Sequence, residues 1–376
     1  MNDTGLKEWS EGLLDRVDAK MQVVADRNRE RIPYTTDPSG CYDDRSQDIG
    51  WWTNGFWGGL LWQLYVYSGN DLYKEEAVRN EEALDRCFLS YGMMDHDNGF
   101  RWLPTAVAHY RIDRNEASLN RGLLAASHLA GRYNTDGGFI RAWNPFKGED
   151  HTGWAIIDCM MNLPLLYWAS EETGDPRFSQ IARHHADKAL SSFLRPDGSS
   201  NHIVVFNPGD GALVETKGGQ GYGVGSSWTR GQAWALYGFI LSYLHTGEEK
   251  YKEASKRVAN YFIANIPEDG LIPIDFRQPV DAKAEDSTAA AIASCGLIEL
   301  SKRERGRDRL VYLNAALKLL RSLAGSRSEL SADTDNIIKG GSVAYDTGEW
   351  DMAIIYGDYY FVEALMKLAG KELFIW

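Results

Sequence analysis

Asp158 is the residue in this sequence whose setting most clearly suggests chemistry. It is the only charged residue between Thr152 and Ser170. The segment 153–170 is apolar on every face, which predicts a helix that is buried all round. Ionising a carboxyl group in such surroundings is costly, so its pKa should rise toward the range in which a general acid works. The alternative is a buried Asp that only holds backbone groups.

A second carboxylate, Asp97, lies in the polar stretch Asp95-His96-Asp97-Asn98-Gly99. Sugar chemistry commonly requires one acidic carboxyl group to donate a proton and a second to hold or polarise the substrate. If both segments line a barrel, Asp97 at one helix entrance can approach Asp158 in the next inner helix. The alternative for Asp97 is a turn residue or a helix N-cap.

A metal site is not expected. Asp95 and Asp97 flank His96 on an extended stretch, but no second histidine cluster at ligand spacing completes a site. The pair His184-His185 lies in an amphipathic segment and is expected to be solvated. The cysteines form no CxxC pair, and those in apolar runs are expected to be core residues. The four cysteines are Cys41, Cys87, Cys159 and Cys295.

Arg230 lies between two tryptophans in the run Trp228-Thr-Arg-Gly-Gln-Ala-Trp234. Such an Arg either forks onto the carboxylate of a substrate or stacks on a neighbouring indole as a structural residue. His202 lies in the long excursion 196–227 and is a candidate for orienting a substrate hydroxyl or carboxylate. The Gly-rich run 218–223 in that excursion has no phosphate-loop context, so a mobile loop over the site is predicted.

The elements that must position these residues follow a loose repeat. Ser68-Gly69-Asn70 recurs as Thr173-Gly174-Asp175 and as Thr246-Gly247-Glu248. In each case an apolar segment precedes the Gly and an amphipathic segment follows it. Gly just after a helix is a C-cap signal, and Asn or Asp beside it can cap the next helix. Each unit is therefore predicted to be a helical hairpin.

Apolar and amphipathic segments alternate along the whole chain. The amphipathic segments cover about 6–28, 71–90, 116–133, 176–194, 248–265 and 307–325, and the apolar ones about 54–67, 101–112, 153–170, 229–245, 286–302 and 351–369. The economical packing is an inner ring of six helices inside an outer ring of six, an all-α (α/α)6 barrel. No Pro-, Ser- or Gly-rich linker divides the sequence, so a single domain over 1–376 is predicted.

The loops that lead into the predicted inner helices are rich in Trp, Gly, Asp and Asn. They include Gly50–Trp57, Asp95–Trp102, Gly138–Trp143, Gly225–Trp234 and Gly348–Asp351. One mouth of the barrel should therefore gather indole rings, at least two carboxylates and Arg230. This combination is typical of a carbohydrate site.

Composition excludes several kinds of partner. The formal net charge is -13, so the surface repels nucleic acid and anionic membranes. An acidic substrate would have to meet a locally basic site. The N-terminal segment is charged and amphipathic without a hydrophobic signal core, which favours a cytoplasmic protein.

Several of these stretches resemble a known family. They are Trp52–Trp57, Asp95–Phe100, Ile157–Leu166, Ser227–Trp234 and Tyr356–Tyr360. Their order and content resemble the unsaturated glucuronyl hydrolases, glycoside hydrolase family 88. The resemblance spans nearly the whole chain, and it implies an (α/α)6 barrel without a metal or organic cofactor.

The resemblance also implies an activity, the removal of a Δ4,5-unsaturated uronic acid from the non-reducing end of lyase-generated oligosaccharides. On that reading Asp158 protonates C4 of the vinyl ether and then acts as base toward water adding at C5, and Asp97 holds the substrate and supports charge development. The matching substrate-contacting positions are Trp52, His96, Trp143, His202, Gln220, Arg230 and Trp234.

The segment 337–348 is where the resemblance places the choice of the next sugar and of its sulfation. Lys339 and Ser342 are candidates for meeting a sulfate. An unsaturated rhamnogalacturonyl hydrolase of the same fold is the nearest alternative enzyme, and a non-catalytic carbohydrate-binding barrel is the alternative of another class. We expect a monomer or a weak homo-oligomer.

Overall fold

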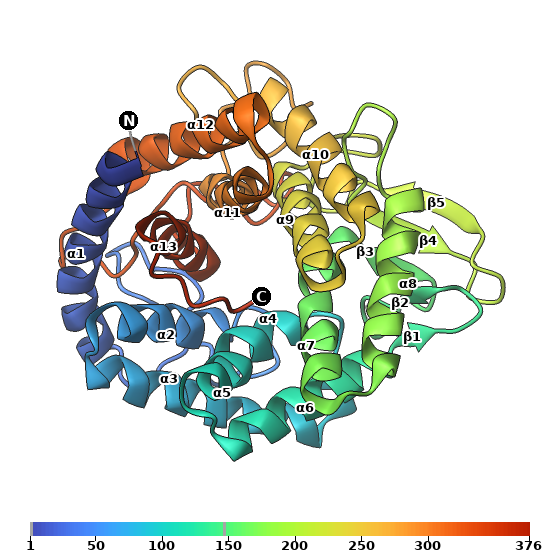
Figure 1. Cartoon of the computed structure of the whole chain (residues 1–376), viewed down its shortest axis with the longest axis horizontal. Helices are drawn as coiled ribbons and strands as arrows, with labels where there is room; N and C mark the ends of the chain where they lie inside the picture. Colours follow the sequence, from blue (N-terminus) through green and yellow to red (C-terminus); the bar gives the residue numbers. More distant parts are fainter. Residues whose placement is uncertain (1–2, 146–147) are drawn as a thin grey trace.

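A computed structural model describes residues 3–145 and 148–376. Its helices form two concentric rings (Figure 1). The amphipathic segments form the outer ring, each burying one face against the inner helices. The outer helices are α1 (Asp3–Arg27), α3 (Asp71–Ala83), α6 (Glu116–Ala130), α8 (Pro176–Ser192), α10 (Glu249–Ala264) and α12 (Gly306–Ser322).

The inner ring consists of the apolar segments. Its members are α2 (Phe56–Ser68), α4 (Asn98–Trp102) with α5 (Ala108–Asp113), α7 (Leu163–Thr173), α9 (Thr229–Thr246), α11 (Ser287–Arg303) and α13 (Ile355–Ala369). A π-helical turn, η3 (Leu103–Val107), joins α4 to α5 at Pro104. Every residue of α9 from Thr229 to Ser242 is buried, as expected of a helix surrounded by others. The predicted (α/α)6 barrel is confirmed.

The turns of the predicted repeat have the expected caps. A glycine with φ between 69° and 74° ends each of the three inner helices of the repeat, α2, α7 and α9, in the left-handed region that favours glycine. Two of the outer helices then begin with a side-chain cap: Asn70 accepts from Leu72 N at 3.1 Å, and Asp175 accepts from Arg177 N at 2.9 Å. Glu248, the third residue of this kind, makes no capping hydrogen bond. The glycines are Gly69, Gly174 and Gly247.

The prediction of one continuous helix over 153–170 is wrong. The chain first forms strand β3 (Trp154–Ile156), then the 3-10 helix η4 (Ile157–Met161), and becomes α-helical only at Leu163. Pro164 is tolerated in the first turn because its missing N–H would have no partner there. Asp158 therefore lies in the turn that enters the inner helix, not within that helix.

Small sheets, which the sequence did not predict, flank the barrel beside α8 (Figure 1). β1 (Tyr133–Asn134) pairs with β2 (Phe139–Ile140), and β3 pairs with β4 (Ile203–Phe206), which pairs with β5 (Leu213–Lys217). All these pairs are antiparallel. The excursion 196–227 is thus partly sheet rather than a plain loop.

The outer segments also end earlier than predicted. After α3 the chain continues through the 3-10 helices η1 (Leu84–Leu89) and η2 (Tyr91–Met93), and after α12 through the π-helical turn η5 (Leu323–Arg327). These short helices carry the chain toward the mouth of the barrel.

One histidine prediction needs correction. His184 is exposed, but His185 is 1% exposed, because β2 covers that side of α8 and Ile140 N donates to His185 Nδ1 at 3.0 Å. Cys159 and Cys295 are fully buried, as predicted for core residues. The described part of the chain contains no helix with the length and apolar character needed to cross a membrane.

The end of the barrel where the inner helices finish is filled by the last residues of the chain. Trp376 is 1% exposed and stacks on Tyr360 with ring centroids 5.7 Å apart. Its Nε1 donates to Glu363 at 2.7 Å. In the same region Lys367 Nζ lies 2.8 Å from a carboxylate oxygen of Glu299. We call the charged residues of this region the far-end cluster: the buried Glu299, Glu363 and Lys367 and the partly exposed Glu372.

Candidate active site

Asp158 is positioned by the sheet beside the barrel. Ile156 of β3 pairs with Ile203 of β4, and Ile157 N donates to His202 O at 3.0 Å. This register places His202 Nε2 3.8 Å from Asp158 Oδ2. The side chain of Asp158 is 14% exposed, so it is largely shielded from water while remaining reachable from the mouth.

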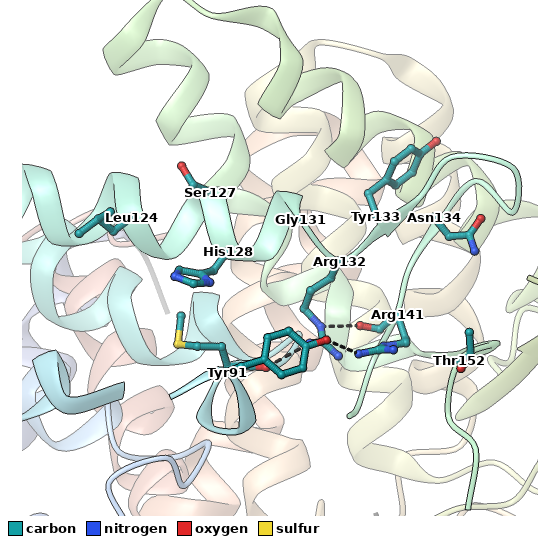
Figure 2. Close-up of a pocket in the computed structure, with 11 residues that line it drawn as sticks. Tyr91, Leu124, Ser127, His128, Gly131, Arg132, Tyr133, Asn134, Arg141 and Thr152 are labelled. Atoms are coloured by element: carbon teal, nitrogen blue, oxygen red, sulfur yellow. Dashed lines mark hydrogen bonds between the residues drawn. The ribbon is translucent and has the colours of Figure 1, made fainter. Parts of the chain in front are cut away.

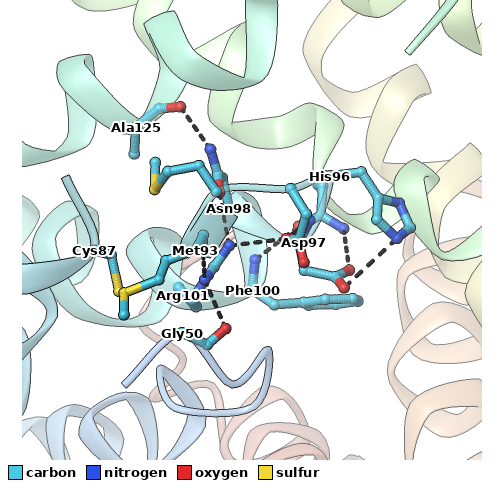
Figure 3. Close-up of polar contacts among 12 residues, drawn as sticks. Gly50, Cys87, Met93, His96, Asp97, Asn98, Phe100, Arg101 and Ala125 are labelled. Carbon is cyan, nitrogen blue, oxygen red and sulfur yellow. Dashed lines mark hydrogen bonds and ion pairs between the residues drawn. The ribbon is translucent and has the colours of Figure 1, made fainter. Parts of the chain in front are cut away.

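Asp97 occupies the N-cap position of α4, but its side chain makes no capping hydrogen bond. Capping, one of the alternatives that the sequence left open, is therefore not its role. Instead Oδ1 accepts from Asn162 Nδ2 at 3.4 Å, and Oδ2 lies 3.5 Å from His96 Nε2 (Figure 3). The carboxylate thus points toward the entrance of the neighbouring inner helix, α7.

The loop that carries His96 and Asp97 is held by the buried guanidinium of Arg101. Its Nη1 donates to Gly50 O and Met93 O at 2.9 and 2.6 Å, and its Nη2 donates to Asp95 at 2.8 Å (Figure 3). Asp95 Oδ1 in turn accepts from Asp97 N at 2.9 Å. The carboxylate of Asp95 is therefore a structural hydrogen-bond acceptor rather than a candidate for catalysis.

Asn162 connects the two candidate catalytic carboxylates. Its Nδ2 donates to Asp97 Oδ1 at 3.4 Å and to the backbone oxygen of Asp158 at 3.2 Å, while its Oδ1 accepts from Phe100 N at 2.8 Å. From the sequence, Asn162 falls within the family-like stretch Ile157–Leu166 and has no predicted role of its own. Its spacing of four residues from Asp158, about one helical turn, is a signal that could have indicated this contact.

The two histidines beside the carboxylates are neutral near neutral pH. Burial lowers the pKa of His202 to about 3 and that of His96 to about 4. Gln220 N donates to His202 Nδ1 at 3.0 Å, so the proton of the neutral ring lies on Nε2, on the side of Asp158. His202 therefore presents a hydrogen-bond donor to the site and no charge.

The two carboxyl groups retain a proton more strongly than ordinary aspartates. Burial raises the pKa of Asp158 to about 7, although the positive charge of Arg230 opposes the shift. Burial, together with the negative charges of Asp95 and Asp158, raises the pKa of Asp97 well above its usual range. Because the two groups repel each other when both are ionised, the pair keeps a proton near neutral pH. This is the protonation state that a general acid requires.

Arg230 is 1% exposed and its guanidinium is occupied by the protein. Nη1 lies 2.5 Å from Asp286 Oδ2 and donates to Ser342 O at 2.5 Å, and Nη2 donates to Val343 O at 2.6 Å. The guanidinium also stacks over the Trp228 ring at 4.6 Å. Arg230 thus has the contacts of a structural residue, and its binding of a substrate carboxylate stays a prediction. Sequence reasoning missed Asp286 because it lies 56 positions away.

The predicted aromatic residues Trp52 and Trp234 both pack on Phe100 of α4, at 5.5 and 5.1 Å between ring centroids. Trp52 also lies 5.2 Å from Tyr356 at the start of α13. The rings therefore form a wall that continues directly from the helix entered at Asp97. Trp234, Phe100 and Tyr356 are buried, so the partly exposed Trp52 is the ring of this wall that can meet the apolar face of a sugar ring.

Trp143 lies apart from that wall. It packs beside Trp154, at 5.9 Å, against a small apolar cluster that includes Ile156 and Ile203. Ile156 directly precedes Ile157, and Ile203 directly follows His202 in the paired strand. Trp143 therefore borders the site from the side of the sheet.

Gln220 joins the Gly-rich run to the segment before α13. Its Nε2 donates to Val343 O and its backbone oxygen accepts from Tyr345 N, both at 2.9 Å. The proposed sulfate contacts have other partners: the buried Ser342 hydroxyl donates to Glu285 O at 2.5 Å, and the exposed Lys339 lies 4.0 Å from Glu329. Within residues 3–145 and 148–376, no three His, Cys, Asp or Glu side chains are grouped so as to hold a metal ion.

Comparison with known proteins gives a consistent result. The family model for Glycosyl Hydrolase Family 88 matches residues 23–375. The chain is 38% identical over 351 residues to an unsaturated glucuronyl hydrolase of Bacillus sp. strain GL1, covering 90% of this chain and 91% of that protein. It is 35% identical to an unsaturated chondroitin disaccharide hydrolase of Streptococcus pneumoniae, covering 94% and 90%. The crystal structure of the unsaturated glucuronyl hydrolase from Bacillus sp. GL1 superposes with a TM-score of 0.89 at 35% identity, covering 96% of each chain.

Proposed function

The chain belongs to glycosyl hydrolase family 88, and on that premise we propose that it is an unsaturated glucuronyl hydrolase. The substrate is an oligosaccharide whose non-reducing end is a Δ4,5-unsaturated uronic acid. The observation that carries this proposal is Asp158, a buried carboxyl group with a pKa of about 7, beside a second buried carboxyl group, that of Asp97. Asn162 donates both to the Asp97 carboxylate and to the backbone oxygen of Asp158. A binding protein would have no need for a group that is poised to transfer a proton.

In the proposed reaction the protonated Asp158 carboxyl group donates its proton to C4 of the C4=C5 double bond. Positive charge then develops at C5 and the ring oxygen. The Asp158 carboxylate takes a proton from a water molecule as the water oxygen bonds to C5. The resulting hemiketal opens and releases the neighbouring sugar. Asp158 ends the cycle protonated, so one water molecule is consumed and the enzyme is unchanged.

The neighbouring groups can support this cycle without competing for the proton. His202, neutral and with its proton on Nε2, is placed to hold the incoming water or a substrate oxygen near Asp158. Asp97, held by Asn162, can bind a substrate hydroxyl and, in its ionised form, can support the developing positive charge. The partly exposed Trp52 ring provides a surface for the sugar ring, and the buried Trp234 packs behind it on Phe100. These roles are proposals for the named residues.

The segment before α13 bears on the sugar that follows the unsaturated uronate. It contributes the exposed residues Asp346, Glu349 and Asp351, and no Lys or Arg occurs between positions 340 and 366. Because Val343 and Tyr345 of this segment bond Gln220, the carboxylates lie along the mouth. Negative charge there disfavours a sulfate group. We therefore expect unsulfated disaccharides to be better substrates than sulfated ones.

The test is the loss of ultraviolet absorbance of the C4=C5 double bond over a panel of lyase-generated disaccharides. The panel includes matched sulfated and unsulfated pairs and an unsaturated rhamnogalacturonan disaccharide. A binding protein would leave the absorbance of every member unchanged. Preferred turnover of the rhamnogalacturonan disaccharide would replace the glucuronyl assignment by the alternative enzyme of the same fold.

The remaining expectations are also proposals. A single folding unit is supported by one hydrophobic cluster that runs from Leu13 in α1 to Trp376. A cytoplasmic location and a monomeric or weakly associated state are retained from the sequence. Size-exclusion chromatography coupled to light scattering would test the oligomeric state.

A further inference from the structure

A cavity of about 460 Å³ lies between the C-terminal end of α6 and the segments that carry Tyr91 and Arg141 (Figure 2). This volume is in the usual range of small-molecule sites, about 300–1,000 Å³. Two arginines, an exposed tyrosine and several other polar side chains line it. They include Tyr91, Ser127, His128, Arg132, Asn134 and Arg141.

The two guanidinium groups of this cavity converge on a neutral acceptor. Arg132 Nη1 and Arg141 Nη2 each donate to Asn144 Oδ1 at 2.9 Å. The other donors of Arg132 go to backbone oxygens, Nε to Arg141 O and Nη2 to Ala142 O, both at 2.9 Å. In the part of the chain that the structure describes, neither guanidinium forms an ion pair with a carboxylate. Two like charges are thus held together without a counter-charge, on a protein whose net charge is -13.

The nearest carboxylates are engaged elsewhere. Asp95, whose charge acts on Arg132, lies 2.8 Å from Arg101 Nη2. Asp150, which feels the charge of Arg141, accepts a hydrogen bond from Thr152 N at 2.9 Å. Burial and the nearby charge of Arg141 lower the pKa of Arg132, so the pair is electrostatically strained as it stands. An anion between the two groups would relieve that repulsion.

Tyr91 indicates what kind of anion fits. Its side chain is anchored through a hydrogen bond from Arg141 Nη2 to the phenol oxygen at 3.0 Å, yet the residue is 71% exposed (Figure 2). An exposed ring fixed beside a guanidinium offers a flat apolar face next to a positive charge. That combination suits a sugar ring that carries a carboxylate or a sulfate.

The cavity shares a wall with the candidate active site. Ala142 O accepts from His96 N at 3.1 Å on the mouth side and from Arg132 Nη2 at 2.9 Å on the cavity side. Arg132 also donates to Met94 O at 3.1 Å. A single backbone segment, at Ala142, therefore lies between the cavity and the loop that carries His96.

We propose that this cavity is a second saccharide-binding site, which takes an anionic sugar unit between Arg141, Arg132 and Tyr91. The anionic group is a uronate carboxylate or a sulfate ester. The site is separate from the catalytic pair and binds saccharide chains whether or not they carry an unsaturated end. This inference rests on the cavity and not on the reaction proposed above.

The experiment is calorimetric titration of the full-length protein with a saturated hexasaccharide of alternating glucuronate and N-acetylglucosamine. Arg141→Ala is expected to weaken binding by at least about 10-fold, the effect of losing charged hydrogen bonds. Arg141→Lys, which keeps the charge, should lose less. Turnover of an unsaturated disaccharide should be unchanged in both variants. Arg177→Ala, which removes an exposed arginine on α8, is the matched control and should bind like the wild type.

The remaining arms identify the ligand. Maltohexaose, which has no charge, and inorganic sulfate alone should each bind at least about 10-fold more weakly than the acidic hexasaccharide. Equal binding of the hexasaccharide by wild type and Arg141→Ala, or no binding by wild type, would overturn the proposal. Sulfate binding as tightly as the hexasaccharide would reduce the site to one for an inorganic anion. A wild-type protein that binds here but fails to turn over unsaturated disaccharides would refute only the proposed function.

Discussion

Both ends of the barrel bury carboxylates, but their surroundings differ. In the far-end cluster, burial alone would raise the pKa of Glu299, yet the ammonium groups of Lys367 and Lys302 outweigh it and lower that pKa. At the mouth, no Lys or Arg lies within ion-pair distance of Asp97 or Asp158 in the described chain, and the facing histidines are neutral. Removing one member of a matched buried pair destabilises a fold, whereas an unmatched carboxyl group keeps a proton that it can give to a substrate.

The sharpest test of this contrast is Asp158→Asn. An amide of the same shape cannot donate and recover a proton, so kcat should fall by about 10²–10⁴-fold. Circular dichroism and substrate binding should remain as in the wild type. Glu299→Gln at the far end is the matched control, with reduced stability and normal turnover per folded molecule. If Asp158→Asn kept more than about a tenth of the wild-type rate, Asp158 would lose its proposed role.

The converse test is Lys367→Met at the far end. It leaves Glu299, Glu363 and Glu372 without their shared cation, and breaking a buried pair in this way costs about 3–5 kcal/mol of unfolding free energy. Urea denaturation measures the loss. Lys302→Met, which removes a partly exposed partner of the same cluster, should cost only about 1 kcal/mol or less. Equal stability of the two variants would contradict the importance of burial.

Arg230→Ala examines a residue that lies at the mouth, like Asp158, but forms a buried ion pair, like Lys367 at the far end. The sequence predicts a higher KM for an unsaturated uronate, by about 1.5–3 kcal/mol for a lost charged hydrogen bond. The structure adds a loss of stability, because Asp286 would be left buried without its partner. Melting temperature and KM should be measured on the same preparation. A destabilised variant with wild-type KM would end the proposed carboxylate-binding role.

The protonation argument also predicts the pH dependence of turnover. The reaction needs a proton on Asp158, whose pKa burial raises to about 7. The active, protonated form is therefore present below about pH 7 and is lost above it, so kcat should fall as pH rises through this value. A rate that rose through the same range would identify a different group as the proton donor.

The same shift affects stability in a definite direction. The folded protein binds the Asp158 proton more tightly than the unfolded chain, whose carboxyl group has an ordinary pKa. Stability therefore falls as pH rises from about 4 to about 7. Asn at this position cannot ionise, so Asp158→Asn should unfold at a higher temperature than wild type at pH 8. At pH 4, where both proteins are neutral at this position, the difference should be small.

The smallest expected effect is that of chelation. Lys367 supplies positive charge to the carboxylates at the far end. If a divalent ion did the same for the carboxylates at the mouth, a chelator would abolish turnover. We expect turnover to survive exhaustive chelation, because no three His, Cys, Asp or Glu side chains among the described residues are grouped so as to hold a metal ion. Loss of activity that added Mg²⁺ or Zn²⁺ restored would reopen the metal interpretation.

The helical scaffold was predictable because its signals are local. Gly69 and Asn70 end one helix and begin the next through bonds that span only a few residues. The environment of Asp158 was misjudged because β3 is a strand only through its pairing with β4, almost 50 positions later. An apolar run has the same composition in a strand as in a buried helix. Asp286, the partner of Arg230, was missed because it too is distant in the sequence.

The β3–β4 pairing has a consequence for how related sequences can change in length. Successive residues of a strand face opposite sides, so deleting Ile203 would move His202 by one position in the register and turn it away from Asp158. Added residues at the β4–β5 hairpin tip, near 208–211, would leave that register intact. Insertions and deletions in this region should therefore accumulate at the hairpin tip and be absent beside His202, even where substitutions of neighbouring apolar residues are tolerated.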